Sequence, residues 1–210
     1  MTTSYAVSIS GGGQAINKSI TRSGDATVAI SVPLPAGKSG TLTTRTDNDT
    51  GVVTVSSGHG ITTSDTVDVY WSGGRRYGCD VTAQDSTTIS IDLGSGDNLP
   101  STSTAIVVVK QVAANVFIDG DNCKLVAVSY ELAAADGFGC RATFFDAVAG
   151  GGSAVGSGLE LDANEPNVCD VTGGATNLYT GNPILSVVAS NGSGTYDGTL
   201  KIIAEYDSTP

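Results

Sequence analysis

The sequence predicts an all-β protein, in which a two-sheet β-sandwich carries a small inserted β-barrel-like module. Short segments alternate Val or Ile with Ser, Thr or Asp, and turn residues bound each segment, which is the pattern of antiparallel strands. The 28 glycines have no three-residue period, so they indicate frequent turns and not a collagen helix. No long stretch has a helical period, and the one helical turn that the sequence allows, around Leu132–Asp136, ends at Gly137.

The predicted strands share a composition rich in Val, Ile, Leu and Thr, residues that fit a pleated, half-buried surface. In chain order they are Tyr5–Ile9, Thr27–Val32, Val52–Val55, Thr66–Tyr70, Thr88–Asp92, Ala105–Val109, Val116–Ile118, Lys124–Glu131, Cys140–Phe145, Leu159–Leu161, Val168–Val171, Ile184–Ser190 and Thr199–Tyr206.

Two changes in composition divide these strands into groups. The segment "VPLPAGKSG" (32–40), which contains two prolines, interrupts the series of strands. The segment "SGDNLPSTS" (95–103) precedes one more strand, after which the composition of the chain changes at residues 112–114. Residues 38–110 are therefore predicted to form the inserted module, with four or five short strands as in an SH3-like barrel. Residues 1–36 and 112–210 together form the sandwich, for which a jelly roll is one arrangement. A second division, with 1–36 in the barrel and two consecutive domains, stays open.

The strong negative charge of the chain limits the classes of molecule that it can bind. The chain has 21 acidic against 10 basic residues and a net charge of −11, so most of its surface would repel a polyanion, which argues against sequence-specific nucleic-acid binding. The N-terminal residues lack the basic and apolar regions of an export signal, and no apolar run is long enough to span a membrane. We therefore expect a protein made in the cytoplasm, without a membrane partner and without a cofactor.

The four cysteines are spaced too widely to predict a zinc site. Cys79, Cys123, Cys140 and Cys169 form no CxxC pair. Because cytoplasmic synthesis keeps thiols reduced, buried free thiols are favoured over disulfides, which stay the alternative.

The segment "GHGITTSDTVDVYW" (58–71) contains the only histidine and the only tryptophan of the chain. It runs from a His-Gly turn at His59 through Ile61 to a second turn at Ser64-Asp65 and then to the alternating residues 67–71. In this order it resembles a small β module that recurs in virion proteins of tailed bacteriophages, although that pattern usually has glycine where this chain has Ser64. The resemblance extends from about residue 50 to residue 110. The matching residues determine the geometry of turns. It implies a structural protein of a bacteriophage virion.

His59 has two interpretations. A catalytic histidine needs a nucleophile and an orienting carboxylate, and Ser56, Ser57 and Asp65 have the required side chains. However, no G-x-S-x-G nucleophile elbow occurs in the chain. In a turn between two glycines, the histidine ring binds nearby backbone while the aspartate closes the next turn. We expect a turn role for His59, Gly60 and Asp65, and a stability loss of about 1 kcal/mol or less for His59→Ala.

Other motifs that suggest chemistry each lack an essential part. The segment "PAGKSG" (35–40) ends like a phosphate loop, but Val32 stands where the first glycine is required, so we interpret it as a linker. The segments "DNDTG" (47–51) and "DGDN" (119–122) resemble parts of calcium loops, but the first lacks the downstream glutamate and both are common hairpin turns. We therefore expect no metal at either segment.

Two segments are candidates for an interaction surface. The hairpin "YWSGGRRYG" (70–78) carries residue types that are enriched at binding hot spots, as a sugar-binding or partner-binding patch, or else its aromatic residues cap the barrel. Turn-rich segments near the C-terminus fix backbone shape for contact with another protein. The candidate residues are Trp71, Arg75, Arg76 and Tyr77 in the hairpin, and Asn164, Glu165 and Asn177 in the turn-rich segments.

These observations favour a structural function over an enzymatic one, because one histidine and few basic residues leave little for an active site. We expect a non-enzymatic virion protein, made in the host cytoplasm, that docks on other virion proteins as a homo-oligomer. The first candidate is a capsid decoration or cement protein on the capsid lattice, because the strands are short for a ring-wide tail tube. A tail-tube or neck protein is one alternative, and a receptor- or carbohydrate-binding fibre or tip module is another.

Overall fold

The computed structural model describes residues 3–10, 18–22, 26–95, 98–118, 123–133, 140–145, 159–161, 168–169, 184–192 and 198–208. In these residues every regular element is a β-strand, which confirms the all-β prediction. The predicted helical turn around Leu132–Asp136 is wrong at its start, because Leu132 continues a strand and pairs with Leu200; its remainder lies outside the described residues beyond Ala133.

The chain divides into two units. The first unit comprises Met1–Leu34, Val112–Ala189 and Gly198–Pro210, and the second comprises Pro35–Gln111 and Ser190–Asp197. In the sequence, the second unit is thus inserted between strands of the first, through the short connections Pro35–Gly37 and Gln111.

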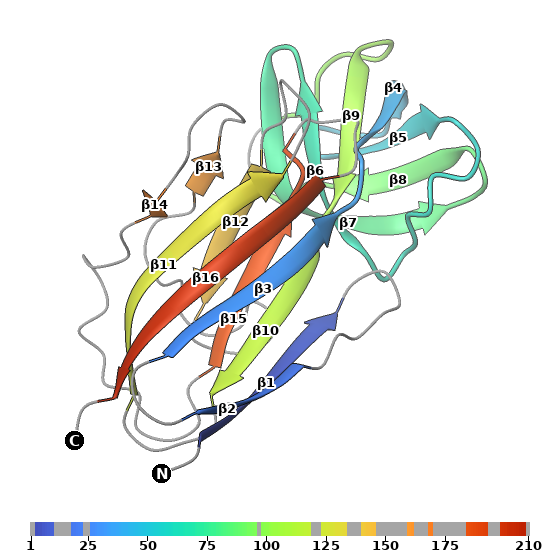
Figure 1. Ribbon diagram of the computed structural model, residues 1–210. Coiled ribbons are helices and arrows are strands. Elements are labelled where there is room, and N and C mark those ends of the chain that lie inside the picture. The colour runs from blue at the N-terminus through green and yellow to red at the C-terminus, as the bar shows by residue number, and fades with distance from the viewer. Residues whose placement is uncertain are drawn as a thin grey trace. The chain divides into compact units, whose positions relative to one another are not determined.

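The first unit contains a six-stranded sheet and a four-stranded sheet (Figure 1). The six-stranded sheet has the order β13-β12-β15-β10-β1-β2 and contains β1 (Thr3–Ser10), β2 (Lys18–Arg22), β10 (Val112–Ile118), β12 (Cys140–Phe145), β13 (Leu159–Leu161) and β15 (Ile184–Ser190). The four-stranded sheet has the order β14-β11-β16-β3 and contains β3 (Ala26–Leu34), β11 (Cys123–Ala133), β14 (Val168–Cys169) and β16 (Gly198–Ser208). That these sheets form a sandwich or a jelly roll stays a prediction.

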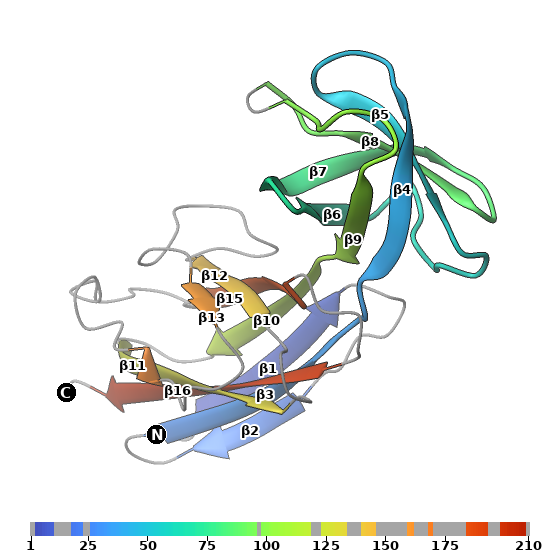
Figure 2. The ribbon, with the colours of Figure 1, turned by 90° about the horizontal axis from the view of Figure 1, so that it is seen from above.

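The second unit is a closed six-stranded barrel, with the order β4-β5-β8-β7-β6-β9 and back to β4 (Figure 2). Its strands are β4 (Lys38–Arg45), β5 (Thr50–Val55), β6 (Thr66–Trp71), β7 (Gly74–Gln84), β8 (Thr88–Asp92) and β9 (Ala105–Lys110). All six pairings are antiparallel, so closure leaves the barrel without a free edge. Six strands correct the expectation of four or five.

Two barrel strands, β4 and β7, differ from the predicted pattern. Strand β4 begins at Lys38, inside the predicted linker. Leu42 is its only fully buried residue, so the mostly polar sequence of β4 lacks the apolar alternation that predicts a strand. Strand β7 loses its alternation at Gly78, whose φ of 67° accompanies a shift in the register with β6. The linker at 35–40 is therefore corrected to the three residues between β3 and β4.

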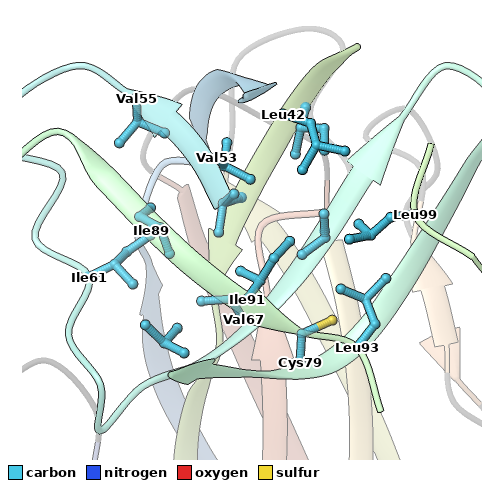
Figure 3. Packing of buried hydrophobic residues seen from close by; sticks show 14 residues of the cluster. Leu42, Val53, Val55, Ile61, Val67, Cys79, Ile89, Ile91, Leu93 and Leu99 are labelled. Carbon is cyan, nitrogen blue, oxygen red and sulfur yellow. The ribbon is translucent and has the colours of Figure 1, made fainter. Parts of the chain in front are cut away.

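The barrel core is built from inward-facing side chains of all six strands and three loop residues (Figure 3). It contains Leu42, Val53, Val55, Ile61, Val67, Val69, Cys79, Val81, Ile89, Ile91, Leu93, Leu99, Ile106 and Val108. Gly40 is required where β4 approaches β5 closely, because a Cβ atom there would collide with the carbonyl oxygen of Thr54. This packed barrel positions the loops and the hairpin described next.

Candidate functional site

His59 lies in the loop between β5 and β6 and is buried, with 7 % of its surface exposed. Gly58 and Gly60 on either side have φ angles of 77° and 71°, a left-handed backbone that favours glycine. The backbone N–H of Ile61 donates to His59 Nδ1 at 3.1 Å, which leaves the ring proton on Nε2. Nε2 donates to the carbonyl oxygen of Asp85 at 2.7 Å. The ring therefore ties two loops of the barrel together.

This geometry gives His59 no catalytic partner in the described loop. Both ring nitrogens bind backbone groups, so neither forms a pair with the hydroxyl of Ser56 or Ser57. The carboxylate of Asp65, the third member of the hypothetical triad, binds elsewhere. The catalytic interpretation of these residues thus lacks the hydrogen bonds that it requires.

Asp65 closes the turn that follows His59. Its Oδ2 accepts hydrogen bonds from the backbone N–H of Thr62 at 2.8 Å and from the Thr62 hydroxyl at 3.1 Å. Lys110 Nζ, at the end of β9, lies 2.7 Å from Asp65 Oδ1. Burial acts to raise the pKa of Asp65, but the hydrogen bond and charge of Lys110, together with Thr62, outweigh it and hold that pKa below its usual value.

Two further aspartates hold hairpin turns in the same way. Asp47 Oδ1 accepts hydrogen bonds from the hydroxyl and the backbone N–H of Thr50, both at 2.7 Å, which lowers the pKa of Asp47 to about 2. Asp85 Oδ1 accepts from the backbone N–H groups of Thr87 at 2.7 Å and Thr88 at 2.8 Å, which also lowers its pKa. The Asp47 carboxylate of the calcium-loop-like segment 47–51 is therefore bound to its own turn.

The β6–β7 hairpin assembles part of the predicted interaction surface. Trp71 pairs with Gly74, so the connecting turn is residues 72–73. The guanidinium carbon of Arg75 lies 5.7 Å from the centroid of the Tyr77 ring. The Tyr77 ring meets Tyr70 edge to face, with centroids 6.1 Å apart. Arg75 and the two tyrosines thus form one cluster.

Arg76 forms hydrogen bonds to backbone carbonyl groups. Its Nη2 donates to the carbonyl oxygen of Ser95 at 2.8 Å, and its Nε donates to that of Leu93 at 3.4 Å. The guanidinium therefore holds the segment that follows β8, and we assign Arg76 to the frame of the barrel.

An open cavity of about 600 Å³ lies on the barrel beside the hairpin, and we call it the Trp71 groove. It is lined by Ser39 and Gly40 of β4, Tyr70 and Trp71 of β6, Ser72, Gly74 and Arg75 of the hairpin, and residues 105–107 of β9. The strand register places Ser39, Val107, Tyr70 and Arg75 in one row across four neighbouring strands. Arg75 is the one charged side chain among these lining residues.

A glycine at position 74 lets the Trp71 indole lie against β7. A Cβ atom at Gly74 would lie 2.8 Å from Cζ2 and 2.9 Å from Cε2 of that ring, which is closer than such atoms approach. A Cβ atom at Gly73 would lie 3.9 Å from the nearest indole atoms, an ordinary contact. Trp71 also packs against the barrel core, so the indole is held between the core and the groove.

A buried carboxylate in β6 is a feature that the sequence patterns did not reveal. Asp68 is fully buried, and its Oδ1 accepts hydrogen bonds from Gln111 Nε2 at 2.6 Å and from the backbone N–H of Gly78 at 3.0 Å. Its Oδ2 accepts a hydrogen bond of 2.5 Å from the hydroxyl of Ser190, which lies 122 residues further along the chain. The only local indication of this buried carboxylate in the sequence is the position of Asp68 between two valines of a strand.

The other predicted site residues, Asn164, Glu165 and Asn177, lie outside the described residues. Cys79 is a buried free thiol, as predicted, and burial raises its pKa to about 12. The side chains of the remaining three cysteines are not among those that the structure describes.

No protein-family model, no curated protein and no solved structure matches the chain. Within the described ranges, no three His, Cys, Asp or Glu side chains are grouped so that they could hold a metal ion. No helix in that part of the chain has the length and apolarity needed to cross a membrane. The function is therefore argued from the geometry of the barrel.

Proposed function

We propose that the protein is a non-enzymatic structural protein of a bacteriophage virion, and that it decorates the capsid lattice. The observation that carries the proposal is the use that the barrel makes of its ionisable side chains. His59, Asp47, Asp65 and Asp85 all bind backbone groups of turns. Side chains engaged in this way fix loop shape, and they do not form the paired acid, base and nucleophile that catalysis requires.

The charge and the His-Gly module give further support to this proposal. A net charge of −11 keeps a protein soluble before assembly and disfavours retention on nucleic acid. The His-Gly turn and the aspartate turn, which carry the resemblance to phage virion modules, both lie in the barrel unit. As a decoration protein, the chain docks on the major capsid protein as a cyclic homo-oligomer, with Asn164, Glu165 and Asn177 as the predicted contact residues.

A second candidate function is a receptor- or carbohydrate-binding module of a tail fibre or tip. The Trp71 groove favours it, because aromatic and arginine side chains line an open cavity on the barrel. A tail-tube or neck role is the other alternative. The expectation that the strands are too short for it is corrected by the structure, because β7, β11 and β16 each have 11 residues.

The mass of the purified chain by light scattering, with negative-stain images of the same sample, tests the decoration role. A discrete cyclic oligomer supports it. Stacked rings or tubes support the tail-tube role in its place. A strict monomer at concentrations of roughly 10 μM argues against a preformed decorating oligomer and leaves the binding module as the better account.

A further inference from the structure

We propose that His59 is a pH-sensitive switch for the loop of residues 56–64. In its neutral form the ring holds this loop closed on the barrel, and the gain of a second proton opens the loop. The inference concerns the barrel alone. It goes beyond the proposed virion role and can fail or succeed independently of it.

The hydrogen bonds of the His59 ring require one neutral tautomer. Nδ1 accepts a hydrogen bond from the backbone N–H of Ile61 at 3.1 Å, so this nitrogen carries no hydrogen. Nε2 lies 2.7 Å from the carbonyl oxygen of Asp85, which can only accept, so Nε2 carries the hydrogen. A doubly protonated ring has a donor on each nitrogen and would direct its Nδ1–H at the N–H of Ile61. Because the ring is also buried, the closed loop excludes the charged form.

The loop is attached to the barrel through two side chains. His59 and Ile61 are buried, and the other residues of the segment 56–64 are exposed. Ile61 belongs to the barrel core (Figure 3). A Cβ atom at Gly58 or Gly60 would meet no atom within 4 Å, so open space surrounds both positions. Loss of the histidine hydrogen bonds therefore removes one of the two attachments of a loop that has room to move.

The other charged groups around the ring keep their charge between pH 7 and pH 5. Asp65 and Asp85 are the acidic residues of the two loops that the ring joins, and the pKa of each is held below its usual value. Lys110 forms an ion pair with Asp65, and a lysine is charged throughout this range. An exposed histidine, in contrast, gains its second proton near pH 6.5. Acid in this range therefore acts on the loop through His59, the only histidine of the chain.

The direction and the size of the effect follow from proton binding. The open loop binds the second proton and the closed loop does not, so the ratio of open to closed molecules rises as the pH falls. The contribution of the ring to loop closure is fully present above about pH 6.5 and is lost progressively below it. From pH 7 to pH 5 the ratio of open to closed molecules should rise about 25-fold. Opening exposes the apolar side chain of Ile61, which the closed loop buries.

Hydrogen exchange of the Ile61 amide, followed by NMR on the full chain, measures this opening. The amide hydrogen is bound to His59 while the loop is closed and is free to exchange when it opens. After correction for the intrinsic exchange rate, the protection of this amide should fall about 25-fold from pH 7 to pH 5. Circular dichroism and the fluorescence of Trp71, the only tryptophan, should stay unchanged, which distinguishes opening of the loop from unfolding of the barrel.

Three variants assign the titration to the ring. His59→Gln keeps one donor and one acceptor but has no group that titrates, so the fall in protection should shrink to less than about twofold. Asp85→Asn keeps the backbone carbonyl that His59 binds and a side-chain acceptor for the turn, and it should keep the full pH dependence. Thr63→Ala, at an exposed position of the loop, should also keep it.

The ring nitrogens provide a test that needs no variant, because a single histidine gives an unambiguous NMR signal. At pH 7 the nitrogen spectrum should show the hydrogen on Nε2. Three results would overturn the proposal. The first is a hydrogen on Nδ1 at pH 7. The second is a ring that gains its second proton between pH 7 and pH 5 while the Ile61 amide stays equally protected. The third is the same pH dependence of protection in the folded His59→Gln variant.

Discussion

The Nε2 atom of His59 donates a hydrogen bond to the carbonyl oxygen of Asp85, 2.7 Å away and 26 residues further along the chain. Asp85 lies in a turn that its own carboxylate closes, through the backbone N–H groups of Thr87 and Thr88. The histidine therefore fastens the loop before β6 to an independently ordered hairpin turn. The only histidine of the chain holds structure in the same way as the turn aspartates.

Replacing His59 with alanine should lower the free energy of unfolding by about 1 to 3 kcal/mol, because the buried N–H of Ile61 loses its acceptor and Asp85 loses its donor. This loss exceeds the value expected from the sequence alone, which did not include burial of the ring. Urea denaturation measures it. Thr63→Ala, at an exposed position of the same loop, is the matched control and should change stability by about 0.5 kcal/mol or less. Equal stability of the two variants would contradict the structural role of His59.

Acid should destabilise the barrel between about pH 4 and pH 2. The folded-state pKa values of Asp65, Asp85 and Asp47 are lowered, that of Asp47 to about 2, and they outnumber the raised pKa of Asp49, which the neighbouring Asp47 causes. A carboxyl with a folded pKa below its unfolded value of about 3.9 binds more protons in the unfolded state. Its stabilisation is therefore fully present above that unfolded value and is lost as the pH falls through the folded pKa. Urea denaturation at a series of pH values should show this decline.

Asp65→Asn removes one of the carboxyl groups whose pKa is lowered by folding. The free energy of unfolding of this variant should therefore fall less steeply with decreasing pH than that of the unsubstituted protein. Asp80→Asn removes the same charge at an exposed position of β7 and serves as the control. If the two variants lose stability in parallel as the pH falls, the ion pair of Asp65 with Lys110 does not contribute as the geometry indicates.

Asp68→Ala should be much more destabilising than Asp68→Asn. Alanine leaves the buried hydroxyl of Ser190 and the partly buried donors of Gly78 and Gln111 without their acceptor, at a cost of about 3 kcal/mol. Asparagine keeps one oxygen acceptor, and the Ser190 hydroxyl can rotate to accept from the new amide. Thermal unfolding of both variants measures the difference. Similar melting temperatures would show that the buried hydrogen bonds contribute little.

Gly74→Ala should displace the Trp71 indole, because the new Cβ atom would lie 2.8 Å from the ring. The expected result is a red-shifted tryptophan emission and greater quenching by acrylamide, as the ring becomes more exposed. Gly73→Ala places its Cβ atom 3.9 Å from the indole and should keep the original spectrum. An unchanged spectrum in both variants would mean that Gly74 does not position the ring.

The sequence predicted the strands whose alternation is regular. Thr88–Asp92, Leu159–Leu161 and Ile184–Ser190 have the predicted bounds. Strand β2 (Lys18–Arg22) and strand β4 were missed because their segments contain few apolar residues, and Leu42 is the only fully buried apolar side chain of β4. Strand β7 was missed because the irregularity at Gly78 interrupts its period.

Local patterns also marked part of the candidate site. The two glycines beside His59 predicted a turn, and Asp65 closes the next turn as its spacing indicates. The hydrogen-bond donors to Asp68 and the hydrogen-bond acceptors of Arg76 lie far away in the sequence, so no local pattern could reveal them. The Trp71 groove likewise requires β4 and β9 beside the hairpin, a pairing that only barrel closure produces.

The most direct test of the proposed virion role is immunogold electron microscopy, with antibody raised against the purified chain, of virions released by lysis of the cells that naturally carry the gene for the chain. The account predicts gold distributed over the surface of intact heads. Labelling restricted to the tail or its tip would move the protein to the alternative roles. Purified virions that carry neither gold nor peptides of the chain by mass spectrometry would contradict the account.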